Sequence, residues 1–388
     1  MLEGTKTTAT SKMLQNYKSS YTATAIQKLI DAGAIPLVKE NCDSFGHGSS
    51  NENSIFGVAK NAIDPEKVAG GSSGGSAVNV AKGFTVFSIG GDTGGSIRQP
   101  AGYNGVYGLK PTYGKVSRYG LHAYTSSTDC VGPIAKTIED IRIVLNTISG
   151  KDPKDPTSLQ GHICKKVAVQ APLQKTKIGY FKGFIQNKSI CPTVQKMFLE
   201  SIEKMKGAGL EIVPLDFWDT ELIVATYYTI AMAETASNLS RLDGSTYGGR
   251  IQHRDLKTSY GITRSENFSD ESKRRIVGGN QVLSQGFSQG VYQKALTIKD
   301  ELTKSFEDHF KAVDFIFSPV TPDTVPKIGA VMSDPHKMYL SDAYTVGFSL
   351  AKLPTLTIPQ GTPTGLQITA NHMQETKILQ MANWCVNL

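Results

Sequence analysis

Two short glycine-serine turns constrain this chain more than any other feature of its sequence. Residues 69–76 read Ala-Gly-Gly-Ser-Ser-Gly-Gly-Ser, and residues 90–101 read Gly-Gly-Asp-Thr-Gly-Gly-Ser-Ile-Arg-Gln-Pro-Ala. A lone stretch of this composition is typical of a flexible linker. Here a helical pattern begins directly after the first turn, and the second lies between a strand-like run and Pro100, so neither has the length of a tether. We therefore interpret both as structured turns.

The second turn has the composition of an oxyanion hole beside a nucleophile. Glycines let the backbone approach a substrate closely and allow successive N–H groups to point at one spot. The N–H groups of Thr93, Gly94 and Gly95 are the candidate donors, and the hydroxyl of Ser96 is the candidate nucleophile for acyl transfer from an amide. Gly-x-Ser-x-Gly is not formed around Ser96, and no His/Asp pair follows in a hydrolase pattern, so a Ser-His-Asp triad is poorly supported.

Helical and strand-like patterns alternate along the chain. Helical spacing of apolar residues is found at residues 23–32, 76–82 and 193–206. Strand-like runs are found at residues 34–38, 84–89, 210–215, 315–319 and 353–359. This alternation predicts an α/β fold with a mixed, largely parallel central sheet and helices on both faces. We expect residues 1–388 to form a single domain.

Charge and cysteine content exclude some classes of protein. The net charge of +7 is compatible with an RNA-associated assembly, but taken alone it favours a mildly basic solvated surface. The five cysteines are widely spaced and form no CxxC pair, which argues against a disulfide framework and a zinc site and favours a reducing compartment. No apolar run reaches the ~20 residues of a membrane helix. No glycine cluster ends in the Gly-Lys-Ser/Thr of a phosphate-binding loop.

The two turns, together with Gly-Val-Tyr-Gly-Leu-Lys-Pro-Thr at residues 105–112, resemble the amidase-signature family. The resemblance implies that Ser96 forms the acyl-enzyme. It also implies that Ser72, which follows a cis peptide bond, relays the Ser96 proton toward a lysine base. Arg98 lies inside the second motif and could bind a substrate carboxylate, but hydrogen bonds to the loop's own carbonyls are the favoured role.

Further segments narrow the resemblance to one branch, the A subunits of glutamyl-tRNA(Gln) amidotransferases, and extend it over nearly the whole chain. They are residues 7–14, 48–54, 116–120, 234–244 and 333–342. The resemblance implies a glutaminase without a cofactor of its own that passes ammonia to a B subunit. That B subunit uses ATP and Mg to convert Glu-tRNA(Gln) into Gln-tRNA(Gln). A small third subunit, C-type or fungal F-type, and no membrane insertion are also implied.

Two departures from the family pattern bear on activity. The family's base lies in an Ile-Lys-Asp-Asn-like segment just before the stretch that begins here at Thr7, and that lysine is missing. Lys39 is interpreted as a structural or surface lysine. The expectation is therefore either a chain that lacks the N-terminal portion of the family domain or a form that is not a competent glutaminase. Near the C-terminus, an acidic residue expected to meet the substrate amine is replaced by His-Met-Gln-Glu, where Glu375 is more simply a helix-start carboxylate.

Alternatives remain open at this stage. A stand-alone amidase for a small amide would share both turns, and a catalytically silent scaffold subunit would explain the missing lysine. The sequence does not decide between glutamine and asparagine as the donor. Departures such as Gly91-Asp and Gly102-Tyr-Asn favour a mitochondrial form in the matrix, with a cytoplasmic location as the alternative. We also expect exposed apolar surface on this subunit for its B-subunit partner.

Overall fold

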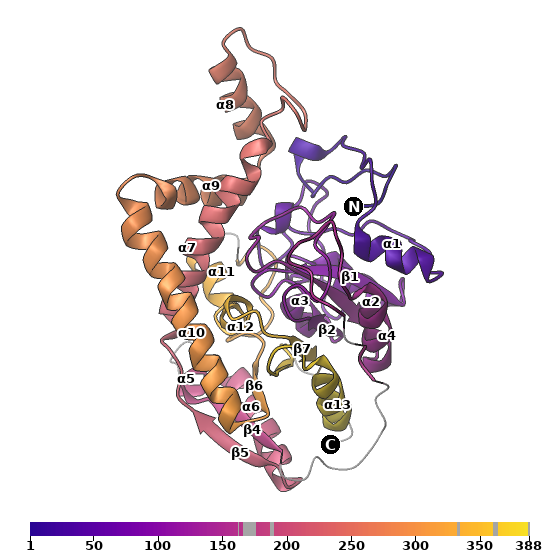
Figure 1. Ribbon diagram of the computed structural model, residues 1–388, viewed down its shortest axis with the longest axis vertical. Helices are drawn as coiled ribbons and strands as arrows, with labels where there is room; N and C mark the ends of the chain where they lie inside the picture. Colours follow the sequence, from indigo (N-terminus) through magenta and orange to yellow (C-terminus); the bar gives the residue numbers. More distant parts are fainter. Residues whose placement is uncertain (162, 166–175, 187–189, 332–333, 360–363, 387–388) are drawn as a thin grey trace.

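A computed structural model gives the fold of the chain (Figure 1). It describes residues 1–388 except 162, 166–175, 187–189, 332–333, 360–363 and 387–388. Residue 333, the first of the segment 333–342 noted above, therefore lies outside the described residues. In the described part of the chain, no helix combines the length and apolarity needed to cross a membrane.

Eight strands form one sheet in the order β1-β3-β2-β7-β8-β6-β4-β5. Their bounds are β1 Phe87–Asp92, β2 Tyr107–Lys110, β3 Cys130–Ala135, β4 Lys177–Phe181, β5 Glu211–Leu215, β6 Phe315–Pro319, β7 Thr355–Ile358 and β8 Leu366–Thr369. The mixed sheet of an α/β fold is confirmed, but the expectation that its strands run largely parallel is wrong. Only β4 pairs in parallel, with β5 and β6, and the other five pairings are antiparallel. Strands joined by short connections, such as β7 and β8, can only pair antiparallel.

Thirteen α-helices surround the sheet in the described part of the chain. They are α1 Thr24–Asp31, α2 Gly74–Lys82, α3 Arg98–Tyr103, α4 Ile138–Ile148, α5 Lys182–Gln186, α6 Pro192–Gly207, α7 Thr220–Asn238, α8 Leu256–Asn267, α9 Asp270–Leu283, α10 Gln293–Ala312, α11 Pro335–Ser341, α12 Val346–Leu350 and α13 Glu375–Val386. Three short 3-10 helices and a π-helical turn complete the described elements: η1 Lys12–Leu14, η2 Ser44–Gly46, η3 Leu239–Arg241 and η4 Ser288–Tyr292.

Strand β3 shows how helices cover both faces of the sheet. Ile134 packs in a cluster with residues of α2 and α3, whereas Val131 and Ala135 belong to the main core, which includes α4. Because successive side chains of a strand point to opposite faces, these helices lie on opposite sides of the sheet. The flanking helices therefore agree with the predicted architecture.

Local sequence explains most of the element boundaries. The predicted helix at 76–82 is α2, which ends where Gly83 adopts a φ of 77°, as glycine does after a helix. The predicted strands at 315–319 and 353–359 are β6 and β7. The predicted strand at 34–38 is wrong: in the described structure this segment belongs to no helix or strand. The prediction for residues 84–89 is shifted, because β1 begins at Phe87.

Helix α8 projects from the body of the molecule, and α9 leads from it back onto α7 (Figure 1). α8 buries only Ser259 and Thr263, so its own contacts with the core are few. A small separate cluster, which includes Leu14, Phe45 and Phe268, packs where this projection meets the N-terminal segment. The projection therefore consists of α8, whereas α9 packs against the body.

Candidate active site

The first glycine-serine turn leads directly into α2, and its peptide bond between Gly71 and Ser72 is cis. The Gly71 N–H donates to the Gln99 side chain at 3.0 Å, and the Ser72 carbonyl accepts from the Asp43 N–H at 3.1 Å. A Cβ on Gly71 would lie 2.0 Å from the Asp43 carboxylate. Only glycine therefore fits at this position, because a side chain would collide with Asp43.

The second turn connects β1 to α3 and leaves its amides available. In the part of the chain that the structure describes, the N–H groups of residues 93–96 have no hydrogen-bond acceptor. The carbonyl of Gly94 accepts from the Thr345 hydroxyl, and the next amide, Ile97 N–H, is held by Asp92 at 3.1 Å. Gly95 has a φ of 146°, which favours glycine. The turn is thus fixed through its carbonyls and its flanks while consecutive N–H donors stay free for a developing oxyanion.

The two turns lie against each other. The Ser73 N–H donates to the Ser96 carbonyl at 3.1 Å, and both serines predicted to act in catalysis, Ser72 and Ser96, are buried. The hydrogen bonds of the described residues include none between the Ser72 and Ser96 hydroxyls. The structure therefore joins the two turns through their backbones, and the proton relay between the hydroxyls stays a prediction.

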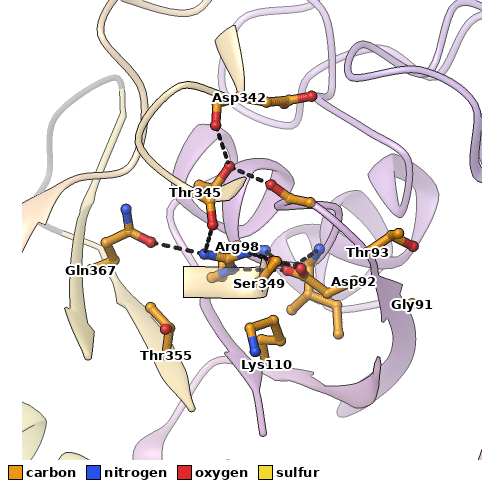
Figure 2. A network of polar contacts seen from close by, with 12 residues as sticks. Gly91, Asp92, Thr93, Arg98, Lys110, Asp342, Thr345, Ser349, Thr355 and Gln367 are labelled. Carbon is orange, nitrogen blue, oxygen red and sulfur yellow. Dashed lines mark hydrogen bonds and ion pairs between the residues drawn. The ribbon is translucent and has the colours of Figure 1, made fainter. Parts of the chain in front are cut away.

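Arg98 lies behind the second turn and is fully buried (Figure 2). Its guanidinium makes two hydrogen bonds of 3.0 Å to the Asp92 carboxylate. Its remaining donors reach the Thr345 carbonyl at 3.0 Å, the Gln367 side chain at 3.3 Å and the Ser349 hydroxyl at 2.7 Å. Burial opposes ionisation of Asp92, but the charge and hydrogen bonds of Arg98 outweigh it and lower the Asp92 pKa. This is the geometry of an arginine that holds the loop, the role that the sequence analysis favoured over substrate binding.

A second buried arginine, Arg275 of α9, has different surroundings. It pairs with Glu271 at 2.7 Å and donates to the Tyr124 hydroxyl. Its guanidinium carbon lies 5.3 and 5.2 Å from the ring centres of Tyr124 and Tyr228. No hydrogen bond involves its Nη2 among the described residues. Arg275 therefore keeps donor capacity inside an aromatic cage.

Asp342 is the buried carboxylate beside this cage. It accepts from the Tyr228 hydroxyl at 2.6 Å and from the Ser49 hydroxyl at 3.0 Å. Its carbonyl accepts from Thr345 at 3.0 Å, the same hydroxyl that bonds to Gly94 (Figure 2). Asp342 is thus connected to the second turn through one side chain.

Two tyrosines place the cage next to both turns. A Cβ on Gly46 would lie 3.6 Å from the Ser72 hydroxyl and 3.8 Å from the Tyr124 ring. A Cβ on Gly94 would lie 2.5 Å from the hydroxyl of Tyr227. The cage around Arg275 therefore borders the first turn through Tyr124. It borders the second through Tyr227, whose ring centre lies 5.0 Å from that of Tyr228.

Three buried carboxyl groups around the turns have raised pKa values. Burial raises the pKa of Asp43 to about 7, against hydrogen bonds from the Asn51 and Asn53 amides. Burial also raises the pKa of Asp129 to about 6, although it accepts from the Thr93 hydroxyl at 2.6 Å. For Asp342, burial raises the pKa to about 6 against the hydrogen bonds from Tyr228 and Ser49. Such clustering of perturbed carboxyl groups is typical of functional sites.

Lys39 and Glu375 lie apart from the serines. The Lys39 ammonium bonds to the Thr7 hydroxyl at 3.3 Å, and burial lowers its pKa. Glu375 begins α13, where it pairs with Lys115 at 3.1 Å and accepts from the Thr112 N–H at 2.9 Å. Both positions fit the structural roles that the sequence analysis preferred for them.

A cavity of about 450 Å³ lies elsewhere, between residues 10–12, 52–55 and 265–270. Neither serine, nor Arg275 or Asp342, lines it. The candidate site is therefore defined by the second turn and the side chains around it, and not by this cavity. No group of three or more His, Cys, Asp or Glu side chains within the described residues could hold a metal ion.

Sequence reasoning did not assign a role to Arg275 or Asp342. Arg275 lies in a charged helix without a local motif, and its tyrosine partners are far away in the sequence. Asp342 falls in the segment 333–342 that carried part of the resemblance, but the substrate-facing acid was sought at residues 372–375 instead. The one sequence signal for Asp342 was its place in that segment.

Comparisons with known proteins identify the family of the chain. The family model described as Amidase matches residues 1–379. The A subunit of the glutamyl-tRNA(Gln) amidotransferase of Neisseria meningitidis serogroup A is 44% identical over 387 residues, covering 98% of this chain and 80% of the relative. The corresponding A subunit of Thermoanaerobacter pseudethanolicus is 45% identical, with 98% and 79% covered.

Solved structures show the same relationship. The crystal structure of the glutamyl-tRNA(Gln) amidotransferase A subunit from Thermotoga maritima has a TM-score of 0.82 and 34% identity, covering 99% of this chain and 80% of that one. A bacterial aryl acylamidase described as a member of the amidase-signature enzymes has a TM-score of 0.84 at 18% identity. The second likeness concerns the fold alone.

Proposed function

This chain belongs to the amidase family, and from that premise we propose that it is the glutamine-hydrolysing A subunit of a glutamyl-tRNA(Gln) amidotransferase. It is an enzyme of the amidase and amidotransferase class. The relatives named as A subunits support the assignment to that branch. The single observation that carries the chemistry is the second turn, whose N–H groups are free beside the Ser96 hydroxyl.

The free N–H groups of this turn support acyl transfer at Ser96. The Ser96 oxygen attacks the side-chain amide carbon of glutamine, and the N–H groups of residues 93–95 stabilise the oxyanion that forms. Ammonia leaves as the acyl-enzyme forms, and water then releases glutamate. The Ser72 hydroxyl is the proposed carrier of the Ser96 proton, because the first turn lies against the second.

Glutamine recognition is proposed from the two buried charges in the cage. Glutamine has an ammonium group and a carboxylate at the end opposite its amide. Asp342 supplies the negative charge for the ammonium, and the free donor of Arg275 supplies hydrogen bonds for the carboxylate. Arg275 is paired with Glu271 but keeps a free donor, and Asp342 has hydroxyl donors but no ion-pair partner among the described residues. A stand-alone amidase for an apolar amide would gain nothing from the Asp342 charge, whose burial is costly without a cationic partner.

The mechanism also needs a base that accepts the proton from Ser72. No side chain among the described residues that could serve as this base bonds to Ser72. Lys39 bonds to Thr7 instead. We propose that turnover depends on a lysine of the family's Ile-Lys-Asp-Asn-like segment. Without it the chain acts as the silent scaffold considered above. We also propose that ammonia passes to a B subunit, which uses ATP and Mg and works with a small third subunit, C-type or fungal F-type. The proposed location of this complex is the mitochondrial matrix.

Ammonia release tests this function. The complex with its partner subunits is assayed with glutamine, with asparagine and with the neutral amide propionamide. We expect release from glutamine far above the other two. Ser96→Ala should abolish it, and Ser72→Ala should lower kcat by roughly 10²–10⁴-fold with KM little changed, as expected for loss of positioned acid–base catalysis.

The alternatives give other results in the same assay. Equal release from propionamide would favour the stand-alone amidase. No release from any amide by an intact complex, even with the lysine-bearing segment present, would favour the scaffold. Release that survives Ser96→Ala would remove Ser96 from the mechanism.

A further inference from the structure

A buried histidine lies between the first turn and the aromatic cage. His47 follows the short helix η2 and is fully buried. Its N–H donates back to η2 at 2.9 Å, and its carbonyl accepts from the Asn53 side chain at 2.7 Å. Its neighbour Gly46 is close to both the Ser72 hydroxyl and the Tyr124 ring. The backbone that carries His47 is therefore fixed beside the first turn.

The imidazole of His47 bonds to two helices. Its Nδ1 lies 2.9 Å from the Ser272 hydroxyl of α9, and its Nε2 lies 3.4 Å from the Thr235 hydroxyl of α7. The Ser269 hydroxyl donates to Ser272 at 3.0 Å, so the Ser272 proton is left for Nδ1, and Nε2 carries the ring proton. The Thr235 hydroxyl in turn donates to the Tyr124 carbonyl at 3.4 Å. An ordered chain of hydrogen bonds therefore runs from the start of α9 through His47 to Tyr124.

This chain of hydrogen bonds requires a neutral imidazole. Burial, and then the charge of Arg275, hold the pKa of His47 well below its usual value of 6.5. A protonated ring would have two donors and no acceptor for the Ser272 proton. It would also place a second buried cation near Arg275. The neutral form, which accepts on one side and donates on the other, is the form that bonds to both helices.

Both ends of the chain of hydrogen bonds lead to Arg275. The His47 ring is nearly perpendicular to the Tyr124 ring, with ring centres 4.8 Å apart, and Arg275 donates to the Tyr124 hydroxyl. At the other end, Ser272 precedes Arg275 by three residues on α9, so the two side chains lie on the same face of that helix. His47 thus contacts a partner of Arg275 and also the helix that carries Arg275.

We propose that His47 is a positioning residue for substrate recognition, which fixes Tyr124 and the first turns of α9 so that the free donor of Arg275 faces the substrate carboxylate. The proposal rests on the proposed function, because that carboxylate is the one of glutamine. Hydrogen bonds to a carboxylate depend closely on the placement of the guanidinium, and a shift of roughly 1 Å is enough to weaken them. Leucine at position 47 would fill a similar volume but leave Ser272 and Thr235 without their ring partner.

Steady-state kinetics of ammonia release test this role on the complex with its partner subunits and the lysine-bearing segment. His47→Leu should raise KM for glutamine roughly 10-fold, as expected for loss of a positioning hydrogen bond. Its kcat should change less than about 2-fold, because the reacting atoms are not affected. For the carboxylate-free analogue 4-aminobutanamide, kcat/KM should not change.

Two further variants accompany His47→Leu. Ser272→Ala removes the hydrogen bond to Nδ1 with a smaller change of shape, so it should also raise KM for glutamine, even if His47→Leu does not fold. His309→Leu is the matched control, because His309 of α10 also contacts a serine hydroxyl, that of Ser305 at 3.4 Å, and an aromatic ring, that of Phe181. Its kinetic constants should match those of the wild type.

A double-mutant cycle tests whether His47 acts through Arg275. In the Arg275→Lys background, His47→Leu should lower kcat/KM for glutamine less than about 2-fold further, because the donor that His47 positions is already lost. Full additivity of the two substitutions would overturn the proposal. An unchanged KM in both His47→Leu and Ser272→Ala would overturn it too, as would an equal loss for glutamine and 4-aminobutanamide.

The same data separate this proposal from the proposed function. If the wild type and the two variants prefer glutamine to 4-aminobutanamide with the same KM, the proposed function stands and the role of His47 falls. If the wild type uses both amides equally well, both proposals fall, because there is then no recognition of the carboxylate for His47 to support.

Discussion

Arg98 and Arg275 are both fully buried arginines near the nucleophile turn, yet their surroundings are opposite. Arg98 gives its donors to a carboxylate, a carbonyl, an amide and a hydroxyl of the protein. Arg275 has one carboxylate and one phenol as partners and is otherwise faced by aromatic rings. A buried arginine whose donors are all taken is part of the framework. One that keeps a donor in an aromatic cage is available to a ligand.

The first prediction sharpens this comparison through stability. Arg98→Met leaves the buried Asp92 carboxylate without its partner, so the free energy of unfolding should fall by roughly 3–5 kcal/mol. Urea denaturation of the purified chain measures the change. Lys311→Met is the control, because Lys311 pairs with Asp308 on the exposed surface of α10 and its loss should change the free energy of unfolding little. Similar losses for the two variants would contradict the structural role of Arg98.

The second prediction concerns recognition by Arg275. Arg275→Lys keeps the charge but loses the planar donor set, so kcat/KM for glutamine should fall roughly 10²-fold. Stability should change less than for Arg98→Met, because Glu271 keeps contacts to Arg274 and, at 3.3 Å, to Tyr339.

Steady-state kinetics with 4-aminobutanamide, which is glutamine without its carboxylate, provide the control for this variant. The wild type and Arg275→Lys should use that compound equally poorly. If the substitution lowers kcat/KM for both substrates by the same factor, Arg275 acts through the fold and not through the substrate carboxylate.

The third prediction uses the raised pKa of Asp342, about 6. Only the ionised carboxylate attracts an ammonium group, so kcat/KM for glutamine should fall about 10-fold for each pH unit below about 6. Asp129 has a raised pKa in the same range, so a pH profile alone does not identify the group. Glutaramate, which is glutamine without its amine, distinguishes Asp342 from Asp129. Its pH profile should lack the fall in kcat/KM that is due to Asp342, because it has no ammonium group for that carboxylate to attract. Identical profiles for the two substrates would assign the titration elsewhere.

The buried Asp342 carboxyl should also make a small, pH-dependent contribution to the free energy of unfolding. Since the pKa of Asp342 is higher in the folded chain than its ordinary value, the folded state binds the proton more tightly. Its contribution favours folding below about pH 4 and is lost as the pH rises through about 6. Asp342→Asn should therefore flatten the pH dependence of the unfolding free energy between these values, measured in urea at each pH. An unchanged slope would mean that the carboxyl is not desolvated.

The sequence predicted what depends on local pattern. The observed positions of both turns, α2 and β6 match those predicted from the sequence. Glycine positions and apolar spacing determine structure over only a few residues, so they can be read locally. The antiparallel pairings were missed because strand direction depends on connections and not on the strands themselves. The segment 34–38 has strand-forming residues, but a strand also needs a partner, and the described chain provides none.

The candidate site divides in the same way. Ser72 and Ser96 stand in motifs and could be named from the sequence. Arg275 and Asp342 lie near each other because α9 and the segment before α12 fold against Tyr124 and Tyr228. Such long-range contacts cannot be predicted from the residues adjacent to either one in the sequence. From the sequence, the structural role could be favoured for Arg98 over substrate binding. Only its hydrogen-bond partners in the structure show that its donors are all used within the protein.

Trapping of the acyl-enzyme tests the central claim most directly. The chain carrying an upstream Ile-Lys-Asp-Asn-bearing segment, in complex with its partner subunits, is quenched in acid during glutamine turnover and digested for mass spectrometry. The account predicts a glutamyl group on the peptide that contains Ser96, its absence in Ser96→Ala, and far less of it in the 388-residue chain without the segment. Ammonia release with the adduct on another residue, or equal turnover with and without that lysine, would contradict it.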